Sequence, residues 1–140
     1  MTDSIYTVAG DRTLGVWLDH WAVTTPDTTY LIWDQPGVRR FSLSYAEMRD
    51  AATCGARVLA ARGIGSGECF CAHLRNRPET VALLFAAAQT GAVLIPTNTK
   101  LTARELGYVL QHSDSRLIIT ESAHTHTVTE AVRTAGGKRA

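Results

Sequence analysis

Residues 69–98, CFCAHLRNRPETVALLFAAAQTGAVLIPTN, carry a strand, a helix and a second strand in succession. The first six residues are nearly all apolar, which is typical of a strand buried on both faces of a parallel sheet. A helical apolar face then runs from Val81 to Ala88 and stops at Gly91, because glycine tolerates the left-handed conformation of helix ends. Residues 92–95 predict a second short strand. Parallel strands need a crossover between them, so this stretch predicts an α/β fold.

The helix in this stretch carries its own start signal. Asn76 is its expected cap, Pro78 falls in the first turn, and Glu79 stands three residues after the cap. Downstream, the capping box formed by Thr102 and Glu105 predicts another helix. Residues 117–120 predict the next strand, and residues from about 124 to 135 predict a final helix.

The segment before residue 69 predicts two helices and a hairpin. Thr13 is the expected cap of an amphipathic helix over residues 14–21. Two β-rich runs, residues 29–33 and 39–43, flank a Pro-Gly turn and predict the hairpin. Ser44, followed three residues later by Glu, begins a long helix that ends at Gly63. We therefore expect a mostly parallel sheet flanked by helices, with a β-hairpin near the start. Residues 13–135 are the expected domain, and residues 1–12 and 136–140 the expected tails.

Composition and charge exclude several classes of protein. The chain has 140 residues, of which 14 are basic and 13 acidic. Its net charge of +1 produces no strong electrostatic field that would attract nucleic acid or an anionic membrane. Its most apolar stretch, residues 81–95, is too short to span a bilayer. Three cysteines without disulfide spacing and a start without a secretory pattern predict free thiols and a cytoplasmic location.

Four patterns could carry chemistry, and each has a structural explanation that we favour. Gly63, Gly65 and Gly67 follow a helix and precede a strand, the reverse of a dinucleotide loop, so they predict a helix stop and a turn. Arg75-Asn76-Arg77 precedes a helix N-terminus and could hold an anion. Without glycines for a close approach of phosphate, capping by Asn76 with two solvated arginines is the preferred interpretation.

The histidine and cysteine pairs are the other two patterns. His124 and His126 have the spacing of two metal ligands, with His112 and Glu121 nearby in sequence, but a surface position near a helix start is expected. Cys69 and Cys71 are expected to be buried, inert thiols. A serine nucleophile is not indicated, because no Gly-x-Ser-x-Gly elbow occurs. We therefore assign no catalytic, cofactor-binding or metal-binding residue to this chain.

Taken together, residues 14–120 resemble the N-terminal part of the adenylate-forming superfamily, which includes acyl-CoA synthetases, luciferases and peptide-synthetase adenylation domains. Residues 41–47 are similar to the strand-to-helix entry of the family, and residues 59–68 to its glycine turn. Asn76-x-x-Glu79 and Gly91-Ala92-Val93-x-x-Pro96-x-Asn98 are similar to two further patterns of the family. The resemblance is completed by Leu101, Glu105, Leu106, Leu110 and Ser113. Thr99 departs from it, because many members have proline there.

The resemblance implies a function for a longer enzyme. Such enzymes join a carboxylate to the α-phosphate of ATP, release pyrophosphate, and pass the acyl group to a thiol, usually that of CoA, with the help of Mg²⁺. The overall pattern is most similar to carnitine and medium-chain-acid CoA ligases, which places it in the metabolism of fatty and other acids. The family's phosphate loop, adenine-contacting segment, ribose-binding aspartate and catalytic lysine are expected after the region present here.

We therefore expect a fragment of an ATP-dependent carboxylic acid–CoA ligase that is inactive alone and binds none of ATP, Mg²⁺ or CoA tightly. Its partners by family are a small carboxylic acid and CoA, with no nucleic acid and no membrane span. The alternative is a non-catalytic protein-binding module that retains the ligase subdomain and self-associates through exposed apolar surface. A small nucleotide-binding α/β protein is a third hypothesis, which would require a phosphate loop after a strand.

Overall fold

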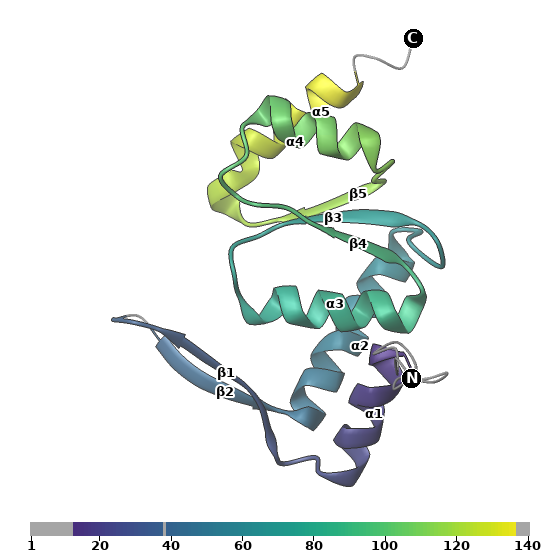
Figure 1. Cartoon of the computed structure of the whole chain (residues 1–140), viewed down its shortest axis with the longest axis vertical. Coiled ribbons are helices and arrows are strands. Elements are labelled where there is room, and N and C mark those ends of the chain that lie inside the picture. The colour runs from purple at the N-terminus through teal and green to yellow at the C-terminus, as the bar shows by residue number, and fades with distance from the viewer. Residues whose placement is uncertain (1–12, 38, 137–140) are drawn as a thin grey trace, which may run out of the picture.

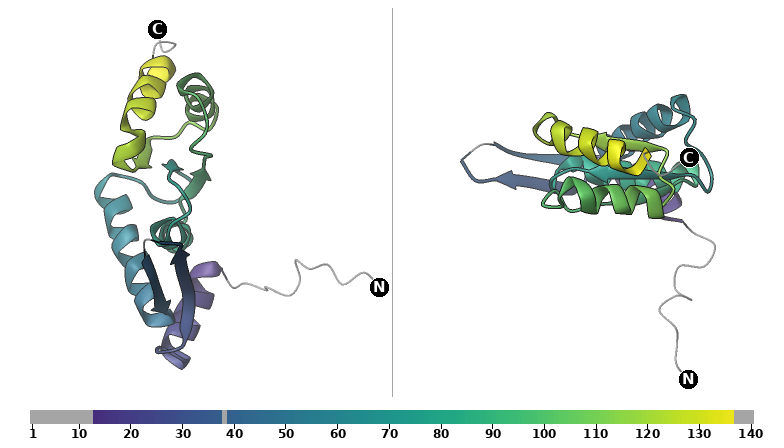
Figure 2. Two further views of the ribbon diagram at one scale, coloured as in Figure 1. Left: turned by 90° about the vertical axis from the view of Figure 1, so that its left-hand side faces the viewer. Right: turned by 90° about the horizontal axis from the view of Figure 1, so that it is seen from above.

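The computed structural model describes residues 13–37 and 39–136, which form a three-layer α/β unit with a projecting hairpin (Figure 1). A parallel sheet forms the middle layer. Helices α2 (Tyr45–Ala61) and α3 (Pro78–Thr90) cover one face of it, and α4 (Ala103–His112) and α5 (Thr125–Gly136) cover the other. The two further views in Figure 2 show the same layering. The predicted α/β class is confirmed. The expected tails, apart from Gly136 at the end of α5, lie outside the described residues.

Three parallel strands make up the sheet in the order β4-β3-β5. They are β3 (Cys69–His73), β4 (Val93–Pro96) and β5 (Leu117–Thr120). The chain passes from β3 to β4 through α3 on one face, then returns past β3 to β5 through α4 on the other face. Right-handed crossovers that run in opposite directions place their helices on opposite faces, so the sheet is doubly wound.

Helix α2 begins and ends as its sequence predicts. The Ser44 hydroxyl accepts a hydrogen bond from the Glu47 backbone N–H, and the Glu47 carboxylate accepts one from the Ser44 N–H. At the other end, the Ile64 N–H donates to the Leu59 carbonyl and the N–H of Gly63 to that of Ala60. Gly63 has a φ of 72°. This Schellman geometry confirms that Gly63 ends the helix. It also places Ile64 in the same core cluster as Leu59.

Helix α3 begins one residue later than the sequence indicated. The prediction that Asn76 caps it is wrong, because the N-cap is Arg77, which makes no side-chain cap hydrogen bond. The steric demand of Pro78 explains the shift: a residue before proline is pushed into the extended region, and proline itself suits the first helical position. At the C-terminal end, Gly91 adopts a φ of 72°, as its left-handed role requires.

Apolar side chains fill both sides of the sheet. Phe70 and Ala72 of β3 pack with Leu59, Leu83 and Ala86 of the α2 and α3 layer. On the opposite face, the core consists of Cys71, Leu106, Leu110 and Ala131, with Ile118 and Val128 packed against them. The side chains of β3 alternate between these two clusters, which confirms it as the central strand predicted from its continuous apolar run.

The N-terminal elements form a separate cluster beside α2 and α3. Helix α1 (Leu14–Thr24), capped by Thr13, places Leu18 against Met48, Ala82 and Phe85. Strands β1 (Thr29–Gln35) and β2 (Arg39–Ser44) pair antiparallel, and their outer part extends away from the body, as Figure 1 shows. The predicted hairpin is confirmed. In the described part of the chain, no helix is both long and apolar enough to cross a membrane.

The ion-paired end of the sheet

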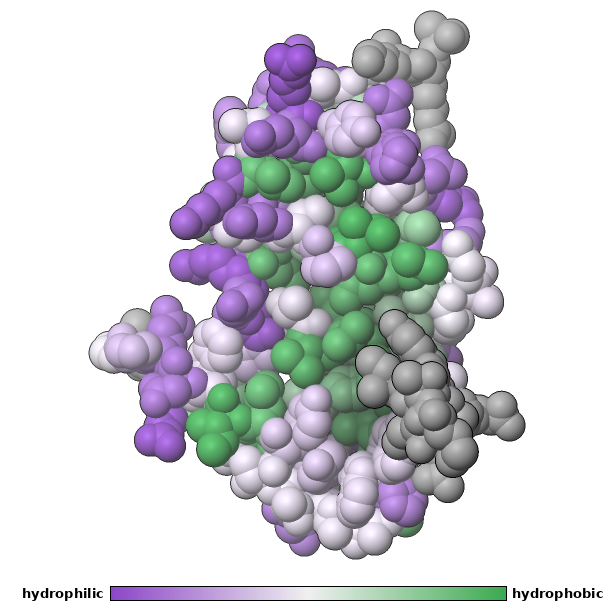
Figure 3. Space-filling view, viewed as in Figure 1, coloured by the Kyte–Doolittle hydropathy of each residue, from purple (hydrophilic) through white to green (hydrophobic). Residues whose placement is uncertain are grey.

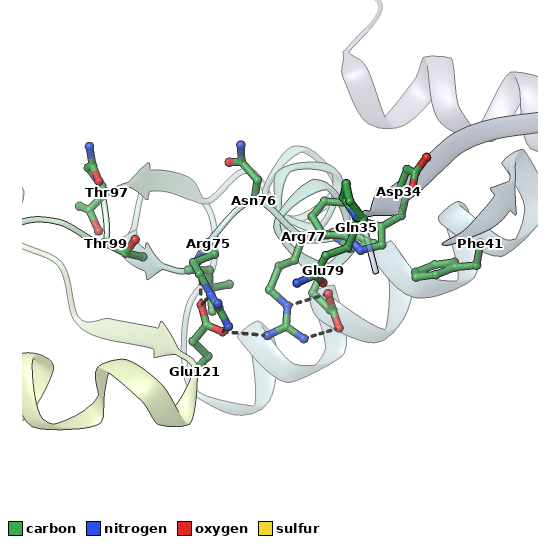
Figure 4. A pocket seen from close by; sticks show the side chains of 15 residues that line it. Asp34, Gln35, Phe41, Arg75, Asn76, Arg77, Glu79, Thr97, Thr99 and Glu121 are labelled. Carbon is green, nitrogen blue, oxygen red and sulfur yellow. Dashed lines mark hydrogen bonds and ion pairs between the residues drawn. The ribbon is translucent and has the colours of Figure 1, made fainter. Parts of the chain in front are cut away.

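The residues of greatest interest lie where β3 and β5 end. In a doubly wound sheet, ligands bind outside the carboxyl ends of the strands, at the point where the chain reverses its direction across the sheet. Here that point lies between β3 and β5, because α3, which follows β3, and α5, which follows β5, lie on opposite faces of the sheet. We call the segment 74–77 after β3, together with 121–124 after β5, the switch-point site. Figure 4 shows its charged side chains converging on Glu121.

Glu121 occupies the middle of the switch-point site. Both its carboxylate oxygens accept hydrogen bonds from the Arg75 guanidinium, at 3.1 Å from Nε and 2.9 Å from Nη2. The Arg75 backbone N–H donates to the same carboxylate at 3.0 Å. These bonds, led by the side-chain pair with Arg75, lower the pKa of Glu121 to about 2. The carboxylate is therefore ionised at neutral pH and joins the two loops.

Arg77 completes the ion-paired cluster. Its guanidinium makes two hydrogen bonds of 2.8 Å to Glu79 and lies 3.6 Å from the Glu121 carboxylate. Arg75 is exposed and Arg77 partly exposed, as expected for solvated arginines, but both are also held by carboxylates that were not considered as partners. The paired carboxylates offset the positive charge of both guanidinium groups, so the described geometry favours a structural ion pair over an anion site.

A buried histidine adjoins this cluster. His73, at the end of β3, is fully buried, and its Nδ1 lies 2.9 Å from the Thr97 hydroxyl. Its ring meets that of His124 edge-on at 5.4 Å, and the Nε2 atoms of both rings lack a hydrogen-bond partner among the described residues. Burial lowers the pKa of His73, as does the proximity of His124, while Glu121 opposes the shift. His73 is therefore held neutral at pH 7.

His73 links all three strand ends. The segment after β4 reaches it through Thr97, and the Thr120 hydroxyl at the end of β5 donates to the His73 carbonyl at 3.0 Å. Sequence reasoning did not single out this histidine. The available signal was its position as the only ionisable side chain in the apolar run from Phe70 to Leu74, apart from the thiol of Cys71.

The other candidate residues take up ordinary positions. His126 is exposed, but His124 is half-buried against His73, so the predicted surface position holds for one of the two. Cys71 is buried, and burial raises the pKa of its thiol, whereas Cys69 is half-buried and so differs from the prediction. Across residues 13–37 and 39–136, no cluster of three or more His, Cys, Asp or Glu side chains is arranged to hold a metal ion.

A groove of about 800 Å³ separates the switch-point site from the hairpin. The hairpin contributes an aromatic wall, where Trp33 of β1 pairs across the strands with Phe41 of β2. The opposite wall carries Asn76 and the ion-paired residues, with Thr97 and the two residues after it. The strand ends thus face a wide hollow in which the two arginines of this wall are paired with carboxylates.

Comparison with known proteins relates this architecture to a family. The family model described as AMP-binding enzyme matches residues 18–139. The chain belongs to the AMP-binding enzyme family. It is 35% identical over 116 residues to the sulfoacetate–CoA ligase of Cupriavidus necator, a match that covers 82% of this chain and 22% of that protein. It is also 36% identical over 91 residues to the long-chain-fatty-acid–CoA ligase FadD13 of Mycobacterium tuberculosis, covering 65% of this chain and 18% of that protein.

A solved structure places the chain within the AMP-binding fold. The N-terminal domain of FACL13 from Mycobacterium tuberculosis superposes with a TM-score of 0.78 at 30% identity, covering 86% of this chain and 29% of that domain. The chain therefore corresponds to part of an acyl-CoA synthetase N-terminal domain, and spans about a fifth of the length of the curated relatives it matches. The resemblance drawn from the ordered motifs of residues 14–120 is confirmed.

Proposed function

We propose that this chain is the opening part of an ATP-dependent, AMP-forming carboxylic acid–CoA ligase and that it is inactive alone. Residues 13–135 then form the first structural unit of a cytoplasmic enzyme. The observation that carries the proposal is family membership combined with a switch-point site in which Glu121 engages Arg75 on both oxygens. The matched parts make up only 22% and 18% of the two relatives, which leaves most of their machinery outside them.

The described residues do not fit a triphosphate. Adenylation requires groups that neutralise developing charge on phosphate oxygens, usually a metal ion with free cationic side chains or backbone N–H groups. At the switch-point site, Arg75 and Arg77 are each held bidentately by a carboxylate. We therefore place ATP, Mg²⁺, CoA and the carboxylic acid in the remaining part of the ligase. Relatives act on different acids according to their names, so no particular acid is assigned.

Pyrophosphate release tests the inactivity of the chain. The purified 140-residue protein would be incubated with ATP, Mg²⁺, CoA and short-, medium- and long-chain carboxylic acids, with full-length FadD13 as positive control. We expect no release above the enzyme-free rate. Acid-dependent release that elutes with the chain through two different chromatographic steps would contradict the proposal.

The second candidate function is a protein-binding module, and one surface feature favours it. Large apolar side chains are exposed on α1, α3 and β4, and these include Leu14, Val16, Val23, Leu84 and Val93. Figure 3 shows apolar surface running across the α3 and β4 region of one face. Extended apolar surface of this kind marks an interface, so self-association is expected. Light scattering that finds only monomer at several concentrations would argue against this function.

A further inference from the structure

We propose that the contact between His73 and His124 is an acid-sensitive switch, which holds η2 (Ser122–His124) and the first turn of α5 against the end of β3 at neutral pH. When His73 takes up a proton, the segment moves away from the strand end. This role goes beyond the proposed function and does not depend on it, because every group involved lies within this chain. It is supported by the hydrogen bonds of the two rings, by the charges around them, and by the way the segment is anchored.

The neutral form of His73 suits its surroundings, whereas the charged form does not. Its Nδ1 atom lies 2.9 Å from the Thr97 hydroxyl, which is also 3.4 Å from the Ala72 carbonyl oxygen. Its Nε2 atom is buried without a hydrogen-bond partner among the described residues. Protonation turns both ring nitrogens into donors, so a charged His73 leaves a buried N–H group at Nε2 without an acceptor. Because a buried, unpaired donor is costly, and more so when charged, the closed arrangement favours the neutral ring.

Two titratable groups that face His73 follow β5. The His124 ring meets it edge-on, with ring centroids 5.4 Å apart, and the buried His124 Nε2 also lacks a hydrogen-bond partner among the described residues. Glu121 lies 3.6 Å from that Nε2 atom, and both its oxygens accept bonds from Arg75. Burial, followed by the proximity of His124, lowers the pKa of His73, while Glu121 opposes the shift. The stabilisation of the closed arrangement is therefore complete above pH 6.5 and is lost as the pH falls through the folded pKa.

The other elements around His73 add no compensating charge in the described part of the chain. The Cys71 thiol lies 3.6 Å from the Thr97 hydroxyl, and burial raises its pKa, so it stays neutral in acid. The segment after β4 and strand β5 contribute the hydroxyls of Thr97 and Thr120. Helices α4 and α5 contribute apolar side chains to the core on this face of β3, namely Leu106, Leu110 and Ala131. Movement of the segment after β5 is therefore the way in which a charged His73 gains access to water.

The segment can move without disrupting the core. None of the three residues of η2 is buried, whereas Ala131, further along α5, is fully buried with Val128 packed against its cluster. The ion pair between Glu121 and Arg75 stays in place meanwhile, because the pKa of Glu121 is about 2. Between pH 7 and 5, acid therefore acts on the histidine contact but not on the ion pair, and residues 122–127 open between two fixed points.

Hydrogen exchange measured by mass spectrometry tests the switch in the 140-residue chain. Exchange of residues 122–129 would be followed at pH 7.5 and 5.5 and corrected for the intrinsic effect of pH on amide exchange. We expect opening to increase about five- to tenfold at pH 5.5, because a released histidine with a pKa of about 6.5 is there protonated about ten times more often than not. Low concentrations of urea should leave this exchange unchanged, whereas exchange of α2, the internal control for global unfolding, should accelerate.

Variants identify the residue responsible. His126→Gln, which removes an exposed histidine from the same segment, should keep the full pH dependence. His73→Gln, or His73→Met if the glutamine variant does not fold, should reduce it to less than about twofold. The proposal is overturned if the wild-type segment shows no increase, if the increase survives in the His73 variant, or if residues 122–129 exchange only through the urea-sensitive route of α2. In the wild-type chain, a His73 ring that titrates at or above pH 6.5 in proton NMR overturns it as well.

Discussion

Arg75 and Glu121 lie 46 residues apart in the sequence, yet three hydrogen bonds of 2.9 to 3.1 Å join them across the ends of β3 and β5. The position they hold is the one that doubly wound folds normally leave to a ligand. In this chain an internal carboxylate takes the place of an external anion. The pair therefore serves to hold two loops in place, and its removal should be seen in stability.

Replacement of Glu121 by Gln is expected to destabilise the fold more than the loss of an ordinary surface pair does, since it removes the charge from a carboxylate that accepts three hydrogen bonds from Arg75. Urea unfolding measured at pH 7 gives the change directly. The matched control is Glu130→Gln, which removes an exposed pair with Arg133 one turn away on α5 and should cost about 0.5 kcal/mol or less. Equal effects of the two variants would show that the switch-point pair is no stronger than an ordinary surface pair.

Acid should weaken the ion pair between Arg75 and Glu121. The pKa of Glu121 is lowered from 4.5 to about 2 when the chain folds, chiefly by its side-chain bonds to Arg75. A lowered folded pKa contributes stability that is complete above pH 4.5 and is lost as the pH falls towards 2. The stability difference between wild type and Glu121→Gln should therefore shrink between pH 5 and pH 3 in urea titrations. A difference that stays constant over this range would refute the assignment.

The sequence was sufficient to predict the elements of the fold, for reasons that are local. The capping boxes at Ser44 and Thr102 and the glycine stops at Gly63 and Gly91 act within one or two turns of chain, so they can be read without tertiary contacts. The start of α3 was misplaced because two local rules compete there, and the conformational restriction by Pro78 prevails over the capping tendency of Asn76.

The switch-point site could not be predicted in the same way. The partner of Arg75 lies 46 residues away, and nothing in the local sequence of either residue specifies the other. Their encounter depends on the strand order β4-β3-β5, because only that order places the end of β5 beside the end of β3. The burial of His73 has the same origin, since Thr97 and His124 reach it from the segments after two different strands.

His73 should make stability depend on pH near neutrality. Burial, followed by the proximity of His124, lowers its pKa below 6.5 in the folded state, whereas Glu121 opposes that shift. The neutral ring is thus favoured by folding, and its contribution is complete above pH 6.5 and lost as the pH falls through the folded pKa. Proton NMR of the ring should show titration below pH 6.5. Urea midpoints should fall from pH 7 to 5.5 in wild type and in the exposed-site control His112→Gln, and less steeply in His73→Gln.

The packing of α4 on α5 gives a prediction in which two effects oppose each other. A Cβ added at Gly107 would lie 3.0 Å from the backbone carbonyl oxygen of Ala131 and 3.4 Å from the Thr134 Cβ. Alanine in a helix interior is favoured over glycine by about 1 kcal/mol. Overpacking against a backbone that cannot rotate away costs about 1–3 kcal/mol. We therefore expect Gly107→Ala to lower the unfolding free energy by about 1 kcal/mol, measured by urea titration.

The control for this prediction is Gly65→Ala, because an added Cβ at Gly65 meets no atom within 4 Å and its φ lies outside the left-handed region. That variant should be unchanged or more stable by up to about 1 kcal/mol, since alanine restricts the unfolded chain. A stabilised Gly107→Ala would mean that α5 shifts to admit the methyl group, and that helix propensity outweighs the contact. If only Gly107→Ala is destabilised, the close approach of α4 and α5 depends on the absence of a side chain at residue 107. That approach also sets the direction of the chain after β5.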